Sequence, residues 1–125
     1  MKKPRILLID DEASVLKVLG DCLAVRGYES VGRRSGIEAR RWLAANSADL
    51  AILDVLLENE DGLEVLSAIK KSHPDLPVII LTGQAHDPEI SHEAGLRGAL
   101  KTLPKALPAD QFLAEVARVV DGLTP

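Results

Sequence analysis

Short apolar runs alternate along the chain with longer segments in which apolar residues recur at helical spacing. Four runs end directly before a polar or turn-forming residue: residues 6–9 before Asp10, 50–53 before Asp54, 78–81 before Thr82, and 98–103 before Pro104 and Lys105. Short apolar runs bounded in this way are typical of strands buried on both faces of a parallel sheet. The pattern therefore predicts a parallel sheet covered by helices.

Helical spacing begins after five positions, which are Asp11, Arg34, Asp61, His86 and Pro108. The clearest apolar stripe consists of Val15, Leu16, Leu19, Cys22 and Leu23. Residues 28–31 form one more predicted strand, with polar residues at alternate positions, as expected at the edge of a sheet. Five strands then alternate with five helices.

This alternation predicts the fold class. Because crossovers between parallel strands are right-handed, we expect an α/β, doubly wound (βα)5 domain of the flavodoxin-like type. Its five-stranded parallel sheet should have strand order 2-1-3-4-5. Residues 83–97 hold only about two turns of helix between Gly83, Pro88 and Gly95, so we expect this segment to be the most mobile.

Several residues mark where the predicted helices begin and end. Gly27 is placed to end the first helix, and Ser35 to cap the second. Asp61 should cap the start of the third helix, and the dipeptide His73–Pro74 should end that helix. The last helix should open after Pro108.

Composition narrows the class of protein. A chain of 125 residues fits one domain, 1–125, and its 46% hydrophobic content with a net charge of −4 excludes disorder. One cysteine argues against a disulfide scaffold and favours a reducing, cytoplasmic location. The mild acidity argues against direct binding of nucleic acid, and no apolar stretch is long enough to cross a membrane.

The polar residues that follow the strands should meet, because parallel strands end at one edge of a sheet. Three carboxylates would converge there with a hydroxyl and an ammonium group: Asp10, Asp11, Asp54, Thr82 and Lys105. Crowded carboxylates repel one another, and a divalent cation with oxygen ligands neutralises them. A metal site is therefore expected. Taken alone, however, the acids at 10–12 are more typical of a helix N-terminus than of a metal site.

The residues at the strand ends resemble a known family. Ile9 to Glu12, Asp54 with Asp61 and Gly62, Leu81 to Gly83, and Lys105 are similar, in order and spacing, to the motifs of response regulator receiver domains in two-component signal transduction. Each motif alone is common, whereas the ordered set is specific. The resemblance covers nearly the whole chain.

The resemblance implies a role for each of these residues. Asp54 would be the phosphoacceptor of this phosphoprotein, attacking a phosphoryl group on a kinase histidine or on acetyl phosphate. Mg²⁺ would be held by Asp11, Asp54 and the backbone carbonyl of Leu56, with Asp10 acting through a coordinated water. Lys105 and Thr82 would contact the phosphoryl oxygens. The domain would thus catalyse only its own phosphorylation and dephosphorylation and would not be an enzyme in the usual sense.

The chain departs from the family pattern at three positions. Glu58 replaces a common proline, so the loop after Asp54 should be more flexible and more negative. Thr102 replaces the aromatic residue that reports phosphorylation, so the signal should leave through the loop and helix after Thr82 or through direct contact with the phosphate. Ala106 replaces the proline after the lysine, and we therefore expect a trans peptide bond between Lys105 and Ala106. Pro104 precedes the lysine instead, and because it has no N–H, the last strand should stop near Leu103.

Partners follow from the resemblance as well. A sensor histidine kinase or a phosphotransfer protein of a phosphorelay would supply the phosphoryl group, and an unknown output domain or partner protein would receive the signal. A homodimer formed through the fourth helix and fifth strand is an open option. Neither nucleic acid nor membrane is an expected partner of this domain.

Two other functions stay open at the sequence level. One is a pseudo-receiver, a protein-interaction module whose output does not depend on phosphorylation, which the missing aromatic residue and proline favour. The other is an enzyme with an aspartyl nucleophile, such as a dehalogenase-like phosphatase, but the segment Asp54 to Leu56 lacks the second acid of that motif. Leu56 is also expected to restrict water and slow self-dephosphorylation.

Overall fold

A computed structural model of the protein describes residues 3–122. Its main sheet has five parallel strands: β1 (Arg5–Ile9), β2 (Glu29–Arg33), β3 (Leu50–Leu53), β6 (Val78–Thr82) and β7 (Lys101–Pro104). Their order in the sheet is β2-β1-β3-β6-β7. Counted among these five strands alone this is 2-1-3-4-5, so the predicted α/β topology is confirmed.

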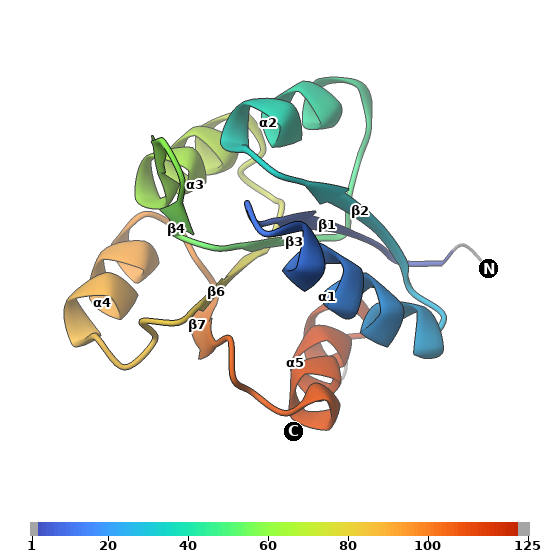
Figure 1. Ribbon diagram of the computed structural model, residues 1–125. Helices are drawn as coiled ribbons and strands as arrows, with labels where there is room; N and C mark the ends of the chain where they lie inside the picture. The colour runs from blue at the N-terminus through green and yellow to red at the C-terminus, as the bar shows by residue number, and fades with distance from the viewer. Residues whose placement is uncertain (1–2, 123–125) are drawn as a thin grey trace.

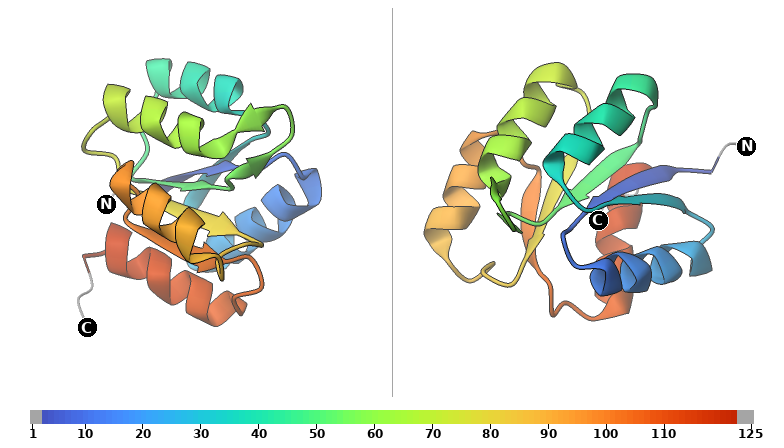
Figure 2. Two further views of the ribbon diagram at one scale, coloured as in Figure 1. Left: turned by 90° about the vertical axis from the view of Figure 1, so that its left-hand side faces the viewer. Right: turned by 45° about the horizontal axis from the view of Figure 1, so that its top comes forward.

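Five helices cover the two faces of the sheet (Figures 1 and 2): α1 (Ala13–Val25), α2 (Gly36–Ala45), α3 (Gly62–Ser72), α4 (Pro88–Leu96) and α5 (Ala109–Val120). Helices α1 and α5 pack on one face, and α2, α3 and α4 pack on the other. Each face has its own apolar core. Both cores are built mainly from aliphatic side chains, as the low aromatic content requires.

The helix boundaries confirm most of the predicted caps. The Ser35 side chain accepts a hydrogen bond from the Glu38 backbone N–H, and Asp61 accepts one from Leu63. His73 follows the last residue of α3. Gly27 follows α1 with a φ of +78°, a left-handed conformation that glycine adopts without strain.

Two strand boundaries differ from the prediction. Strand β2 starts at Glu29 and runs two residues past Val31, because it pairs with β1 along its whole length. Strand β7 starts at Lys101, because Gly98 has a φ of +103° and the Ala99 N–H still bonds back to α4. It also includes Pro104, whose missing N–H is tolerated on an edge strand.

The segment between β3 and α3 contains a two-stranded hairpin that the sequence pattern did not predict. Strand β4 (Leu56–Leu57) pairs antiparallel with β5 (Glu60–Asp61). Asn59, in the turn, has a φ of +63°, which asparagine tolerates better than most residues. The acidic loop after Asp54 is therefore folded back on itself.

Helix α4 is the segment expected to be most mobile, and that expectation stays a prediction. Asp87 caps its N-terminus, and Pro88 occupies its first turn. At its other end the Arg97 guanidinium reaches Glu93 on α4 and the Glu64 and Ser67 side chains on α3. None of the helices in the described part of the chain has the length and apolar character needed to span a lipid bilayer.

Candidate functional site

The carboxyl edge of the sheet brings together polar groups that are almost fully buried. Asp10 follows β1, Asp54 follows β3 and Thr82 ends β6. The two carboxylate residues are each 3% exposed, and Thr82 is fully buried. Buried carboxylates are costly unless they are paired or bind a cation, so this edge requires a compensating positive charge.

Lys105 supplies part of that charge. Its Nζ lies 2.7 Å from Asp54 Oδ2, 2.9 Å from Asp10 Oδ2 and 3.6 Å from Glu12 Oε1. Burial alone would lower the pKa of Lys105. The hydrogen bonds to Asp54 and Asp10 and the charges of both carboxylates outweigh that effect and raise its pKa above the ordinary lysine value. Lys105 is therefore held as a cation between two strand ends.

Backbone groups fix the other oxygens of the two buried carboxylates. Asp10 Oδ1 accepts a hydrogen bond of 2.9 Å from the Glu12 N–H, and Asp54 Oδ1 accepts one of 2.9 Å from the Leu56 N–H. The backbone N–H of Asp54 also donates to Ile9, which continues the pairing of β3 with β1. Both side chains are thus oriented by the local chain as well as by Lys105.

Asp11 is held by a different set of contacts. Its Oδ2 accepts a hydrogen bond of 2.8 Å from the Glu58 backbone N–H in the turn of the hairpin. Its carbonyl oxygen accepts two hydrogen bonds from the Arg34 guanidinium, at 3.1 and 2.9 Å. The hairpin and the end of β2 therefore position Asp11, two contacts that the sequence pattern did not predict.

The burial of Asp10 argues against reading the acids at 10–12 only as a helix N-terminus. Glu12 is the residue at the N-cap of α1, and its side chain makes no capping hydrogen bond. Asp10 precedes the helix and points to Lys105 instead. The structure also adds Glu12 to the site, because its carboxylate is close to Lys105. The only sequence signal for Glu12 was its position directly after two predicted site acids.

The donor set is suited to a hard divalent cation. Ligand oxygens of Asp10, Asp11 and Glu12 lie within 4.8 Å of one another. Three carboxylates, those of Asp10, Glu12 and Asp54, contact the single ammonium group of Lys105, and Asp11 lies beside two of them, so the negative charge is only partly neutralised. Oxygen-only ligands in such a cluster are the type that Mg²⁺ prefers.

Thr82 and Leu56 lie at the same edge in different environments. Thr82 Oγ1 accepts a hydrogen bond from the Gln84 backbone N–H at 3.3 Å, and its carbonyl accepts one from the Lys105 backbone N–H at 3.0 Å. Its hydroxyl is hydrogen-bonded to the loop and not to the carboxylates. Leu56 begins the hairpin, and 47% of its surface is exposed beside the acids.

The three positions that depart from the receiver pattern lie in the hairpin, in β7 and directly after Lys105. Glu58 is exposed in the hairpin turn, and Thr102 is half-buried in β7. The peptide bond between Lys105 and Ala106 is trans, as predicted, because no bond among the described residues is cis.

Comparison with known proteins gives a family. The profile described as the response regulator receiver domain matches residues 6–117. The DNA-binding transcriptional regulator NtrC of Azospirillum brasilense is 33% identical over 125 residues, which is 100% of this chain and 26% of that protein. The response regulator MprA of Mycobacterium sp. (strain KMS) is 34% identical over 122 residues, 97% of this chain and 52% of that protein. The chain thus spans between a quarter and about half of these relatives.

Solved structures show the same fold. A receiver domain protein described as CheY-like from Methanospirillum hungatei JF-1 has a TM-score of 0.91 and 26% identity, covering 97% of this chain and 96% of that one. The beryllofluoride-activated NtrC4 receiver domain dimer has a TM-score of 0.87 and 27% identity, covering 94% and 97%. Together with the profile match over most of the chain, these likenesses show that the chain belongs to the response regulator receiver domain family of two-component systems.

Proposed function

We propose that this receiver domain accepts a phosphoryl group on Asp54 in the presence of Mg²⁺ and so acts as a phosphorylation-dependent signalling switch. The observation that carries the proposal is the contact of Lys105 Nζ with both Asp54 Oδ2 and Asp10 Oδ2, at 2.7 and 2.9 Å. A buried nucleophile beside a fixed ammonium group, at the edge of a parallel sheet, is suited to phosphoryl transfer.

The metal would be held by Asp10, Asp11, Asp54 and the Leu56 carbonyl. The clustering of carboxylate oxygens from residues 10–12 supports this assignment and suggests Glu12 as a further contributor. When bound, Mg²⁺ would neutralise the charge that accumulates on the phosphoryl oxygens. The chain itself supplies the orientation, because backbone N–H groups fix one oxygen each of Asp10, Asp11 and Asp54.

The transfer balances without any further reactant. A carboxylate oxygen of Asp54 forms a bond to phosphorus as the bond from phosphorus to the kinase histidine nitrogen, or to the acetate oxygen of acetyl phosphate, breaks with its electron pair. Lys105 would then exchange part of its contact with Asp54 for a phosphoryl oxygen. Thr82 would give up its hydrogen bond with Gln84 and donate its hydroxyl proton to the phosphate.

The pseudo-receiver alternative has less support. The missing aromatic residue and the missing proline favour it, but the aromatic position, Thr102, bears on how a signal leaves and not on whether Asp54 can be modified. The acids and the lysine needed for phosphorylation are present and in contact. An aspartyl-phosphate switch therefore explains more of the buried charge than a binding module does.

The setting of the domain is also part of the proposal. We place it in the cytoplasm as one domain over 1–125, receiving phosphate from a sensor histidine kinase or phosphotransfer protein and passing the signal to an output domain or partner protein. The chain matches only 26% and 52% of the length of NtrC and MprA, and the additional length of these relatives supports the proposal of an output domain. The dimeric NtrC4 receiver supports testing for a homodimer after activation.

Incubation with Mg²⁺ and acetyl phosphate, followed by intact mass measurement, tests the proposal. The wild-type chain should gain one phosphoryl group, and Asp54→Asn should gain none. Asp110→Asn, which changes an exposed acid in the first turn of α5, is the matched control and should be modified like the wild type. Failure of the wild-type chain to be modified would favour the pseudo-receiver, and steady hydrolysis of a phosphate monoester, which self-dephosphorylation at Asp54 does not produce, would favour an enzyme.

A further inference from the structure

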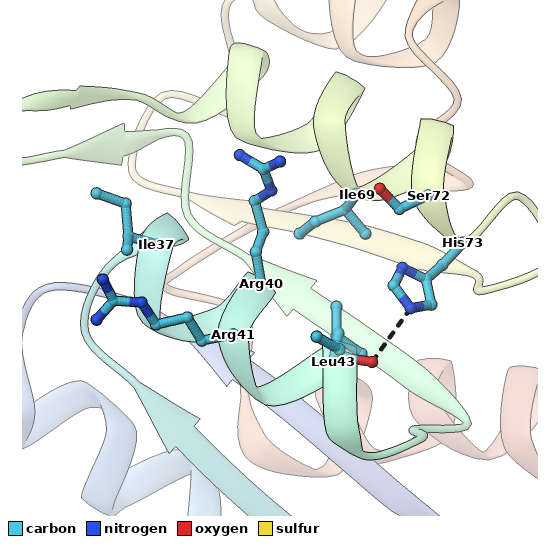
Figure 3. A pocket seen from close by; sticks show the side chains of 8 residues that line it. Ile37, Arg40, Arg41, Leu43, Ile69, Ser72 and His73 are labelled. Atoms are coloured by element: carbon cyan, nitrogen blue, oxygen red, sulfur yellow. Dashed lines mark hydrogen bonds between the residues drawn. The ribbon is translucent and has the colours of Figure 1, made fainter.

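A cavity lies away from the acidic site, between α2 and α3. It is an open groove of about 530 Å³. Its lining comes only from these two helices and the residue after α3: Ile37, Arg40, Arg41, Leu43, Ala44, Ile69, Ser72 and His73. Figure 3 shows Arg40 and Leu43 on the side of α2 that faces Ile69 and His73, while the Arg41 side chain extends to the left, away from α3.

The sequence positions explain why the lining forms a continuous face. Residues 37, 40, 41 and 44 on α2 follow the spacing i, i+3, i+4 and i+7, which places them on one side of a helix. On α3, Ile69 is followed at i+3 and i+4 by Ser72 and His73. The groove is therefore made of two helical faces that meet at an angle.

The floor of the groove is apolar and its rim is basic. Leu43 and Ile69 belong to the core, while 57% of the Ile37 surface is exposed to solvent. Figure 3 shows the Arg40 side chain extending from α2 toward α3. A large exposed isoleucine beside two guanidinium groups is the mixed apolar and cationic surface typical of a binding site.

Neither arginine is neutralised by the protein itself. Within residues 3–122, no carboxylate lies within 4.0 Å of the Arg40 or Arg41 guanidinium. By contrast, Arg97 and Arg118 both pair with glutamates. The lining contains no acid at all, although the whole chain has a net charge of −4.

His73 lies at the far end of the groove, and one of its two ring nitrogens has no hydrogen-bond partner within residues 3–122. His73 Nε2 lies 3.3 Å from the Leu43 carbonyl oxygen, across the groove from α3 to α2 (Figure 3). Its Nδ1 is buried and has no hydrogen-bond partner among the described residues. The contact of Nε2 links α2 to the end of α3 at one end of the groove.

We infer that this groove binds an acidic amphipathic helix of a partner protein. Aliphatic side chains on one face of that helix would contact Ile37 and the floor, and flanking glutamates or aspartates would pair with Arg40 and Arg41. A strand is a poor fit, since the walls are helices whose backbone groups are already bonded. A small ligand is also a poor fit, because the open groove would leave much of it in water.

The inference does not depend on phosphorylation of Asp54, and it is tested on the unphosphorylated full chain. The probe is a synthetic amphipathic helical peptide with leucines on one face and glutamates beside them, and the matched control peptide has glutamines in place of the glutamates. Titration into ¹⁵N-labelled protein should shift the amide signals of α2 and the end of α3. The glutamine peptide should bind at least about tenfold more weakly.

Charge reversal separates the groove from general electrostatics. Arg40→Glu should weaken binding of the glutamate peptide at least about tenfold and should improve binding of a lysine version. Arg26→Glu, an equal change at an exposed residue after α1 on the opposite side of the sheet, should leave both affinities unchanged. Circular dichroism of each variant confirms that the fold is retained.

Several results would overturn the inference. The first two are that the glutamate peptide does not bind at millimolar concentration, or that the glutamine peptide binds with the same affinity. The other two are that Arg26→Glu weakens binding as much as Arg40→Glu does, or that the amide signals shift mainly outside α2 and α3. Displacement of the peptide by octanoate with the same pattern of shifts would assign the groove to small amphiphilic carboxylates. A dimer seen by sedimentation that the peptide dissociates would assign it to a second copy of this chain.

Discussion

Lys105 and Asp54 form an ion pair of 2.7 Å between two groups that are both largely withdrawn from water. The side chain of Asp54 is 3% exposed and that of Lys105 is 23% exposed. The same ammonium also holds Asp10 at 2.9 Å. Lys105 therefore separates two buried carboxylates that would otherwise repel each other across the sheet edge.

Removing that ammonium should destabilise the fold. Because Lys105→Met leaves two buried carboxylates without their partner, the free energy of unfolding at neutral pH should fall by about 2–3 kcal/mol, as measured by urea denaturation. Asp54→Asn in the same background should recover part of the loss. Lys17→Met is the control, since Lys17 pairs with Asp21 on an exposed surface and should change the stability by less than about 1 kcal/mol. Equal effects of the two lysine substitutions would show that the buried pair has no special role.

Tyr28 should titrate at unusually high pH. Its hydroxyl donates to Asp121 Oδ2 at 2.6 Å, and burial together with this hydrogen bond raises its pKa from about 10 to about 12. Since the folded state favours the neutral phenol, this stabilisation is complete below about pH 10 and is lost as the pH rises toward 12. Tyr28 is the only tyrosine, so the ultraviolet absorbance of tyrosinate reports it directly. Asp121→Asn should lower the midpoint, and a wild-type midpoint near 10 would disprove the assignment.

Gly62 is a position where one methyl group should matter. A Cβ there would lie 2.3 Å from Val55 Cα and 2.5 Å from the Val55 carbonyl oxygen, which are backbone atoms next to Asp54. Gly62→Ala should therefore lower the free energy of unfolding by about 2 kcal/mol or more and displace the Asp54 loop. Gly83→Ala is the matched control, because a Cβ at Gly83 meets nothing within 4 Å. Thermal unfolding of the two variants measures the difference, and similar midpoints would contradict the packing described here.

The main sheet could be predicted because its signals are local. Strands β1, β3 and β6 are short apolar runs, β2 has the alternating pattern of an edge strand, and the helix ends carry local signals such as Ser35, Asp61 and Gly27. The strand order follows from general rules of chain handedness. The site residues could also be placed on one edge, because Asp10 and Asp54 directly follow strands and Thr82 ends one.

The features that escaped prediction depend on contacts between distant residues. The hairpin after Asp54 has strands of only two residues, too short for a periodic pattern, and it is held by long-range bonds. Glu58 bonds to Asp11, and Glu60 Oε1 accepts a 2.7 Å hydrogen bond from the Gly36 N–H at the start of α2. The predicted flexible acidic loop is in this way tied to the acidic site and to α2.

Leu56 should control the lifetime of the phosphorylated state. It lies beside Asp54 with 47% of its surface exposed, where an apolar side chain cannot hold or orient an attacking water. Leu56→Asn should therefore speed the loss of the phosphoryl group, by about tenfold if orienting one water lowers the barrier by about 1.4 kcal/mol. Following the phosphorylated mass over time after removal of the donor gives both rates. Identical rates in the wild type and the variant would refute a role for Leu56.

The central claim is that Asp54 itself becomes an acyl phosphate. Its most direct test is to treat the wild-type chain with acetyl phosphate and Mg²⁺, to reduce the product with borohydride, and to sequence the digested peptides by mass spectrometry. An acyl phosphate on aspartate is reduced to homoserine, so the account predicts homoserine at position 54 and only where Mg²⁺ was present. Homoserine at Asp10 or Asp11, or none at any aspartate, would contradict it.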